Sequence, residues 1–444
     1  MSAAPMSLAE RSRRAVWHPC TQMKRHEREP LLAIARAEGP WLFDTDGKRY
    51  LDAVSSWWVN LFGHGHPHIR AALADQLERL DHVMLAGLTH EPVVELSERL
   101  GALTDLGHAF YASDGASATE IALKMSAHAW RNAGRPAKCE FVGLEGGYHG
   151  ETVGALSVTD IALFREAYAP LVRLSAALPS PDARRAEPGE DAVAFAWRCA
   201  LALERHLEQH HARTAALILE PLVQCAGGFG IHDPEYLRLA RALCDRYGVH
   251  LICDEIAVGF GRTGTLFAHE QAGIRPDFLC LSKGLTGGTL PLSVVLTTDA
   301  VYGAFYDDRG ARGFLHSHSY SGNPLACRAA LAVLDLFRDG QGGEPVLARN
   351  HATAQRLDAL CAPLAAHPRV GAARRLGMLW AWDIDVDGLP GFSGAYHLAA
   401  RDEGLLLRPI GNTLYFMPPY VLDDAALEQL AGGALRALER VCGP

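Results

Sequence analysis

The fold is indicated most clearly by the stretch Leu251-Ile-Cys-Asp-Glu-Ile-Ala-Val-Gly-Phe-Gly-Arg-Thr-Gly264, which is followed by Phe278-Leu-Cys-Leu-Ser-Lys-Gly284. Each part begins with a short apolar run and continues with polar residues, among them Asp254 after the first run and Lys283 after the second. Short, nearly continuous apolar runs are typical of strands in parallel sheets that helices cover on both faces. The sequence therefore predicts neighbouring parallel strands with a carboxylate and a lysine at their ends.

A third apolar run, residues 215–219, is closed by Glu220. Between it and the first run lies a helical pattern at 234–247, with proline in its first turn and glycine just past its end. Ligands of such sheets bind outside the carboxyl ends of the strands. We therefore expect Glu220, Asp254 and Lys283 to face one crevice.

The same alternation extends toward the N-terminus of the chain. Helical spacing of apolar residues first appears at Glu91, after a part of the chain that mixes Gly, Pro and His with apolar residues. Beyond it we expect further strands at 108–112 and 138–144, a helix at 116–130, and loops at 178–191 and 339–344.

Helix and strand patterns resume at about Val346, which predicts a separate, smaller domain. We expect an N-terminal segment at 1–70 that contributes to the small domain and the active site. A large α/β domain at 71–337 and a C-terminal small domain at 338–444 complete the expected organisation.

The composition excludes several classes of protein. The 444 residues are 49% hydrophobic and 21% charged, which is ordinary for a globular protein, and the formal net charge of −9 argues against nucleic acid as a partner. No apolar run approaches the roughly 18 residues of a membrane span, and the basic N-terminus lacks the apolar core of a secretory signal. The 10 cysteines form no CxxC pair and are expected to be reduced thiols. We predict a cytoplasmic protein that acts on small molecules.

A lysine at a strand end in a half-buried crevice has a chemical use. Desolvation destabilises the ammonium form and leaves a neutral amine that can form a Schiff base with an aldehyde cofactor. A neighbouring carboxylate suits the pyridine nitrogen of pyridoxal phosphate (PLP), which must stay protonated for the ring to accept electrons. We assign this role to Asp254 and the amine to Lys283. On spacing alone, an Asp–Lys ion pair without a cofactor remains the alternative.

The turn Ser113-Asp-Gly-Ala-Ser117 lies between a predicted strand and a predicted helix. Free N–H groups and the helix dipole favour an anion there, and Gly115 lets the backbone approach a phosphate closely. An ordinary N-cap at Ser113 or Asp114, with a capping box from Ser117 to Glu120, explains the same residues and is compatible with phosphate binding.

Two other groups of residues stand out. Tyr148, in the turn Gly146-Gly-Tyr-His-Gly150, could stack on a pyridine ring, although simple packing is an equal explanation. The histidines at positions 64, 66, 68, 316 and 318 have neither an HExxH pattern nor cysteine partners, so no metal site is expected.

The residues 252–283 resemble the signature of the class III (ω-type) PLP-dependent aminotransferases, and the resemblance continues over nearly the whole chain. It implies PLP as cofactor and fold type I. That fold has a large doubly wound, mostly parallel sheet domain and a smaller α+β domain. It also implies a homodimer with shared active sites.

Three segments are similar to one branch of this family: residues 17–23, 55–64 and 408–419. The resemblance implies amination of 8-amino-7-oxononanoate to 7,8-diaminononanoate in biotin biosynthesis. S-adenosylmethionine is the usual amino donor of this branch, and some relatives use lysine.

The resemblance also implies roles for single residues in cofactor binding. Lys283 would form the Schiff base and move protons, Asp254 would pair with the pyridine nitrogen, and the backbone of Gly115 and Ala116 would hold the phosphate. Tyr148 would stack on the cofactor and face the substrate.

The remaining implied roles concern the substrate and the second subunit. Trp57 would line the substrate channel and Arg408 would hold the substrate carboxylate. Ser319 would donate its hydroxyl to the phosphate in the neighbouring subunit, with Ser317 and His318 beside it, and Ser317 would also contact substrate.

Two departures from the best-known members concern the substrate end. Cys20 replaces a tyrosine and Glu151 replaces an aspartate, at positions that would read the substrate amine and the donor. The donor therefore stays open between S-adenosylmethionine and lysine. Alternatives for the whole chain are another ω-amino acid aminotransferase that uses 2-oxoglutarate or pyruvate, an aminomutase, and a non-catalytic PLP-binding protein.

Overall fold

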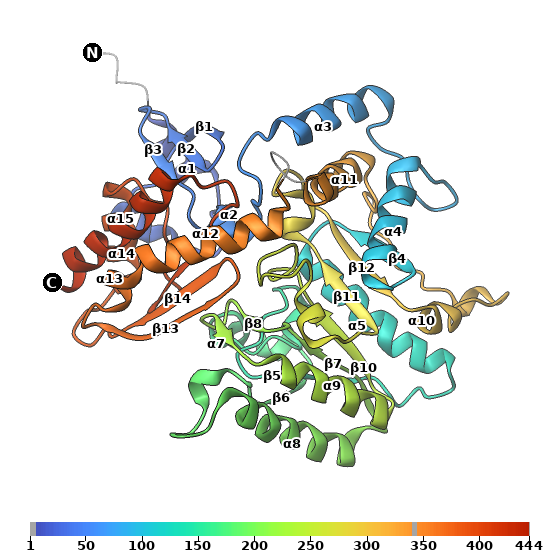
Figure 1. Ribbon diagram of the computed structural model, residues 1–444. Coiled ribbons are helices and arrows are strands. Elements are labelled where there is room, and N and C mark those ends of the chain that lie inside the picture. The colour runs from blue at the N-terminus through green and yellow to red at the C-terminus, as the bar shows by residue number, and fades with distance from the viewer. Residues whose placement is uncertain (1–5, 340–343, 444) are drawn as a thin grey trace.

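A computed structural model describes residues 6–339 and 344–443, and its centre is a seven-stranded sheet of order β4-β12-β11-β10-β7-β5-β6 (Figure 1). Within this sheet only β12 runs antiparallel to its neighbours. The strands are β4 His108–Ala112, β5 Glu140–Leu144, β6 Ala176–Leu178, β7 Thr214–Leu219, β10 His250–Asp254, β11 Phe278–Leu281 and β12 Ser293–Thr297. The predicted α/β class with a mostly parallel sheet is confirmed.

Helices cover both faces of this sheet, as the nearly continuous apolar strands require. Alternate residues of β7 belong to different cores: Leu217 and Leu219 pack with α8 and α9, whereas Ala216 and Ile218 pack with α5. The longer helices are α3 Pro67–Arg79, α4 Glu91–Thr104, α5 Gly115–Asn132, α8 Ala192–His210, α9 Pro234–Tyr247 and α11 Pro324–Asp339.

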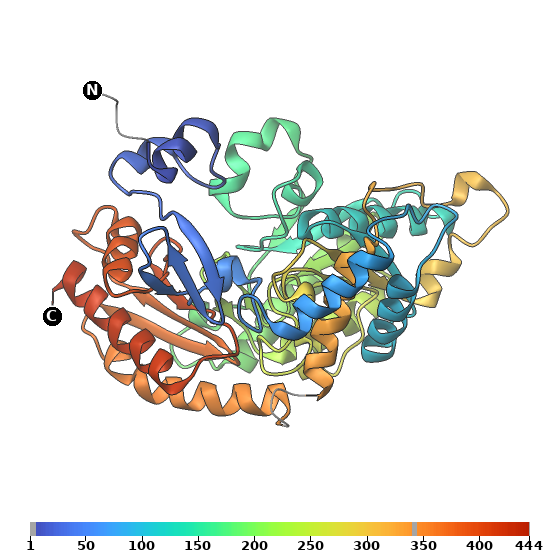
Figure 2. The same cartoon turned by 90° about the horizontal axis from the view of Figure 1, so that it is seen from above.

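The two ends of the chain meet beside the large sheet. Leu51 N–H donates to Gly404 O over 2.8 Å, and Figures 1 and 2 show the N-terminal strands against the C-terminal helices. The elements here are β1 Ile34–Glu38, β2 Trp41–Asp44, β3 Arg49–Leu51, α12 Val346–Leu360, β13 Val370–Leu376, β14 Leu379–Ile384, α14 Phe392–Asp402, β15 Thr413–Phe416 and α15 Asp424–Cys442. The boundary at 337 and 338 stays a prediction, and residues 340–343 of the predicted loop lie outside the described residues.

The other elements are short. They are the helices α1 Leu8–Ala15, α2 Ser55–Trp58, α6 Val153–Leu156, α7 Ala162–Arg165, α10 Asp299–Gly303 and α13 Ala362–Ala365, the strands β8 Val223–Gln224 and β9 Gly230–Ile231, and the 3₁₀ turns Met23–Glu27, Glu166–Leu171, Ala183–Arg185, Ala268–Ala272, Lys283–Thr286 and Gly310–Arg312. No helix in the described part of the chain is long and apolar enough to cross a membrane.

Helix α3 lies before Glu91, in a part of the chain where the sequence shows no helical spacing of apolar residues and where no helix was predicted. This helix buries only Ile69, Ala72 and Gln76, and one of the three is polar. Its apolar stripe is therefore too weak to predict from spacing.

Candidate active site

A cavity of about 470 Å³ opens at the carboxyl edge of the large sheet. Its lining includes the residue at or just after the end of four strands: Asp114 after β4, Glu220 after β7, Asp254 of β10 and Lys283 after β11. The structure therefore brings together the three strand-end residues that we expected to face one crevice.

Asp254 is paired with a histidine inside the protein. Its Oδ2 lies 2.7 Å from Nδ1 of His149, and its Oδ1 accepts the N–H of Ile256 over 3.1 Å. Both side chains of the pair are almost fully buried. No ion pair joins Asp254 to Lys283 among the described residues, so a simple strand-end Asp–Lys pair does not account for this site. His149 was not singled out by the sequence analysis.

Lys283 directs its amine toward the cavity. Its Nζ lies 4.7 Å from the centre of the Trp58 ring, and its backbone has φ of 44°, an uncommon value for a residue with a side chain. Removal from bulk water lowers the pKa of Lys283, and the nearby Cys225 and the acidic groups only partly offset this effect. The neutral amine is thus easier to form than in an exposed lysine.

Glu220 connects two loops that border the cavity. Its two carboxylate oxygens accept the N–H of Tyr148 over 3.0 Å and that of Cys225 over 3.1 Å. Burial raises the pKa of Glu220 to about 7, with Asp254 adding to the rise and His149 opposing it. This carboxyl therefore changes charge near neutral pH.

The start of helix α5 forms one end of the cavity. Asp114 is the N-cap and accepts the N–H of Ser117 over 2.9 Å, which leaves the N–H groups of Gly115 and Ala116 in the first turn for a ligand. A Cβ on Gly115 would lie 2.9 Å from Cγ2 of Ile256, so any side chain there would have to displace Ile256. The predicted capping box to Glu120 is wrong, because that carboxylate instead accepts the N–H of Gly154 over 2.8 Å.

Tyr148 lies at the mouth of the cavity. Its hydroxyl donates to Glu151 over 2.8 Å, and its ring packs against Phe164 at 5.4 Å. Burial and the Glu151 carboxylate raise the pKa of Tyr148 far above its usual value. Cys20 is close to this carboxylate, and burial together with Glu151 raises the pKa of its thiol.

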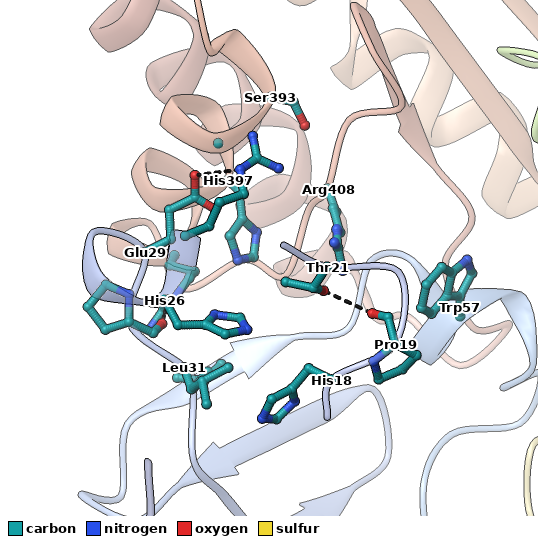
Figure 3. Close-up of a pocket in the computed structure, with 15 residues that line it drawn as sticks. His18, Pro19, Thr21, His26, Glu29, Leu31, Trp57, Ser393, His397 and Arg408 are labelled. Carbon is teal, nitrogen blue, oxygen red and sulfur yellow. Dashed lines mark hydrogen bonds and ion pairs between the residues drawn. The ribbon is translucent and has the colours of Figure 1, made fainter. Parts of the chain in front are cut away.

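A second pocket of about 270 Å³ contains the predicted carboxylate-binding residue (Figure 3). It lies between the N-terminal segment, the first turns of α14, Trp57 and Arg408. The Arg408 guanidinium carbon is 5.7 Å from the centre of the Trp57 ring, and Nη2 donates to the Cys20 carbonyl over 3.5 Å. Trp57 and Trp58 thus line different cavities, and Trp58 is a site residue to which the sequence analysis assigned no role.

The predicted cross-dimer residues lie away from both cavities. Ser317 and Ser319 are exposed, and neither they nor His318 lines the pocket of Lys283 or that of Arg408. The ring of His318 instead lies 3.0 Å from His316, which in turn contacts Lys124 over 2.8 Å.

The large cavity fits PLP by its own chemistry. Lys283 offers an amine for the aldehyde, Asp254 a carboxylate for the pyridine nitrogen, and the start of α5 free N–H groups for the phosphate. The Nε2 atom of His149 is buried and has no hydrogen-bond partner among the described residues, as expected beside a space built for a polar ligand.

Comparisons with known proteins agree with this chemistry. The family model "Aminotransferase class-III" matches residues 22–438. The adenosylmethionine-8-amino-7-oxononanoate aminotransferase of Helicobacter pylori is 42% identical over 433 residues, which is 96% of each chain. The crystal structure of the enzyme of the same name from Methanocaldococcus jannaschii superposes with a TM-score of 0.90 at 32% identity and covers 98% of this chain and 99% of its own. An ω-transaminase from Pseudomonas jessenii, in complex with PMP, has a TM-score of 0.92 at 27% identity and covers 98% of both chains.

Fold and site together define a PLP-dependent enzyme of fold type I. The chain belongs to the class III aminotransferases and is an aminotransferase.

Proposed function

We propose that the enzyme transfers an amino group to 8-amino-7-oxononanoate and forms 7,8-diaminononanoate, a step of biotin biosynthesis, with S-adenosylmethionine as amino donor. The observation that carries the proposal is the pair of adjacent cavities. Arg408 can bind a carboxylate in one cavity and Lys283 can perform chemistry in the other, and the consecutive residues Trp57 and Trp58 line one cavity each. Such a site suits an acceptor whose ketone is separated from its carboxylate by an apolar chain. The full-length likeness to relatives with this named activity supports the same substrate.

Lys283 would carry the proton transfers of the reaction. When bound, PLP supplies an aldehyde carbon and a ring that withdraws electrons from the substrate's α-carbon. The neutral amine of Lys283, held beside the bound cofactor, would take the proton from the donor α-carbon and deliver it to the C4′ position. The same residue would reverse the steps with the keto substrate.

The other residues would hold the reacting groups in place. Asp254, oriented by His149, would keep the pyridine nitrogen protonated, and the N–H groups of Gly115 and Ala116 would hold the phosphate. Tyr148 would cover the cofactor ring from the mouth of the cavity.

At the substrate end, Arg408 would bind the acceptor carboxylate with its planar pair of N–H donors, and Trp57 would pack on the apolar chain. Cys20 and Glu151 would contact the amino end of the acceptor and the donor. The enzyme would use the same surfaces in both half-reactions of a ping-pong transamination.

We further propose a cytoplasmic homodimer in which the loop with Ser317, His318 and Ser319 reaches the partner's phosphate. The exposure of this loop on the single chain supports the proposal. The cytoplasmic location is supported by the ten cysteines, all of which are free thiols.

Separate titrations of the PLP-loaded protein with S-adenosylmethionine and with lysine test the donor. We expect S-adenosylmethionine alone to bleach the visible absorbance, and 7,8-diaminononanoate to form when 8-amino-7-oxononanoate is then added. A response to lysine alone would keep the acceptor and replace the donor. No product with either donor, together with turnover of 2-oxoglutarate or pyruvate, would refute the proposed acceptor.

A further inference from the structure

The turn that carries the two tryptophans has an unusual backbone. Ser55, Ser56, Trp57 and Trp58 have φ values of 49°, 48°, 73° and 73°, so four consecutive residues with side chains lie in the left-handed region. Residues other than glycine visit this region singly and at a cost, and they persist there only where their surroundings enforce it. Some part of the structure must therefore hold this turn.

Asp52 is the residue that holds it. Its carboxylate is fully buried, accepts the Ser56 N–H over 2.8 Å and the Ser56 hydroxyl over 2.6 Å, and lies 2.9 Å from Nε2 of His64. One buried carboxylate thus fixes both the backbone and the side chain of a residue in the middle of the turn.

The flanking residues of the turn are tied to the strand β15 region. The Ser55 hydroxyl donates to the carbonyl of Met417 over 2.6 Å, and the Trp58 indole N–H donates to the hydroxyl of Tyr415 over 3.2 Å. These bonds lock the Trp58 ring in the position where it faces Lys283. Trp57 is left with about half of its surface exposed, in the pocket of Arg408.

We propose that Asp52, with Ser56 and His64, is a positioning site that sets the distance between the carboxylate-binding end and the reacting end of the substrate pocket. The inference rests on the proposed function, because it takes Arg408 as the carboxylate-binding residue. Asp52 touches neither cavity, so it acts through the turn. Loosening the turn would move Trp57 and Trp58 together and would weaken the preference for an acceptor of one length.

The decisive variants are Asp52→Asn and Ser56→Gly in the full-length, PLP-loaded enzyme. Asp52→Asn replaces one acceptor oxygen by an amide donor that faces the Ser56 hydroxyl and His64. Ser56→Gly removes the hydroxyl but keeps a residue that accepts φ of 48°, so this variant is expected to fold normally. The control is Asp299→Asn, because Asp299 makes an equally short contact of 2.9 Å with His108 at the surface, away from both cavities.

We expect Asp52→Asn to raise KM for the keto acid about tenfold, and Ser56→Gly, which keeps the N–H bond to Asp52, to raise KM less, with a smaller change in kcat in both variants. Discrimination among keto acids of different chain length should fall by a similar factor. The near-ultraviolet circular dichroism should lose the part of the tryptophan signal that Trp58→Phe also removes, while Asp299→Asn leaves all of these values unchanged.

An unchanged KM and an unchanged tryptophan signal in Ser56→Gly and Asp52→Asn would overturn the proposal. So would a lower melting temperature with wild-type KM and length preference, because the role of Asp52 would then be structural only. The circular dichroism does not depend on the substrate's identity. If the wild-type enzyme does not convert 8-amino-7-oxononanoate, the proposed function is refuted. The positioning role of the turn is then tested with the keto acid that the enzyme does convert.

Discussion

Replacing His149 by phenylalanine should weaken PLP binding far more than it weakens the fold. The substitution removes the 2.7 Å hydrogen bond to Asp254, which leaves that buried carboxylate with only the N–H of Ile256 and free to turn from the cavity. A hydrogen bond to a charged group contributes about 1.5–3 kcal/mol, and about 1.4 kcal/mol corresponds to a factor of ten. We expect the dissociation constant of PLP to rise about 10- to 100-fold.

The neighbouring residue pair provides a matched control. Nδ1 of His269 lies 2.7 Å from the carboxylate of Glu255, and both side chains are buried. Glu255 directly follows Asp254, but neither His269 nor Glu255 lines the cavity. Titration of the cofactor-free proteins with PLP, followed by absorbance, should therefore show weak binding for His149→Phe and nearly normal binding for His269→Phe. His149→Asn, which keeps an amide donor near Nδ1, should recover most of the affinity. Equal losses in the two phenylalanine variants would refute the idea that His149 acts by orienting Asp254.

Lys283, Arg408 and Glu220 can each be tested by a single substitution. Lys283→Ala should abolish steady-state turnover while PLP still binds, and retained turnover would remove Lys283 from the mechanism. Arg408→Ala should raise KM about tenfold for the keto acid but leave the KM of its methyl ester unchanged, as measured by initial rates. Because burial raises the pKa of Glu220 to about 7, the folded protein binds more protons than the unfolded chain between about pH 4.5 and 7, so its stability falls as pH rises through this window. The loss is about 3 kcal/mol, and calorimetry of the cofactor-free protein should find this slope removed in Glu220→Gln.

The sequence predicts the large sheet well because its signals are local. Strand β11 and helix α9 have the predicted bounds. The strand is marked by an apolar run that ends at polar residues, and the helix by a proline in its first turn and a glycine just after its last residue. The crevice follows from the same signals, because parallel strands place their carboxyl ends at one edge.

The residues that complete the site could not be predicted in this way. His149 and Asp254 are 105 residues apart, and only the order of the strands brings them together. The turn at Ser55 to Trp58 contains no glycine, so nothing in its composition indicates left-handed backbone. The hydrogen bonds that enforce this conformation, which Asp52 and Met417 accept, exist only in the folded chain.

Cys20 and Glu151, the two residues that differ from the best-known family members, would influence the choice of amino donor through their charge. The exposed Glu151 carboxylate accepts the Tyr148 hydroxyl, and burial together with this carboxylate raises the pKa of the Cys20 thiol, so Glu151 is the acidic group that a donor would meet here. The sulfonium of S-adenosylmethionine and the ammonium of lysine are both cations, and both suit this charge, whereas the second carboxylate of glutamate does not. Glu151 has the same charge as the usual aspartate but a side chain that is one CH₂ group longer. The replacement would therefore change the space for a donor more than the charge that the donor meets. Charge would therefore not separate the two cationic donors, and selection between them would depend on their size.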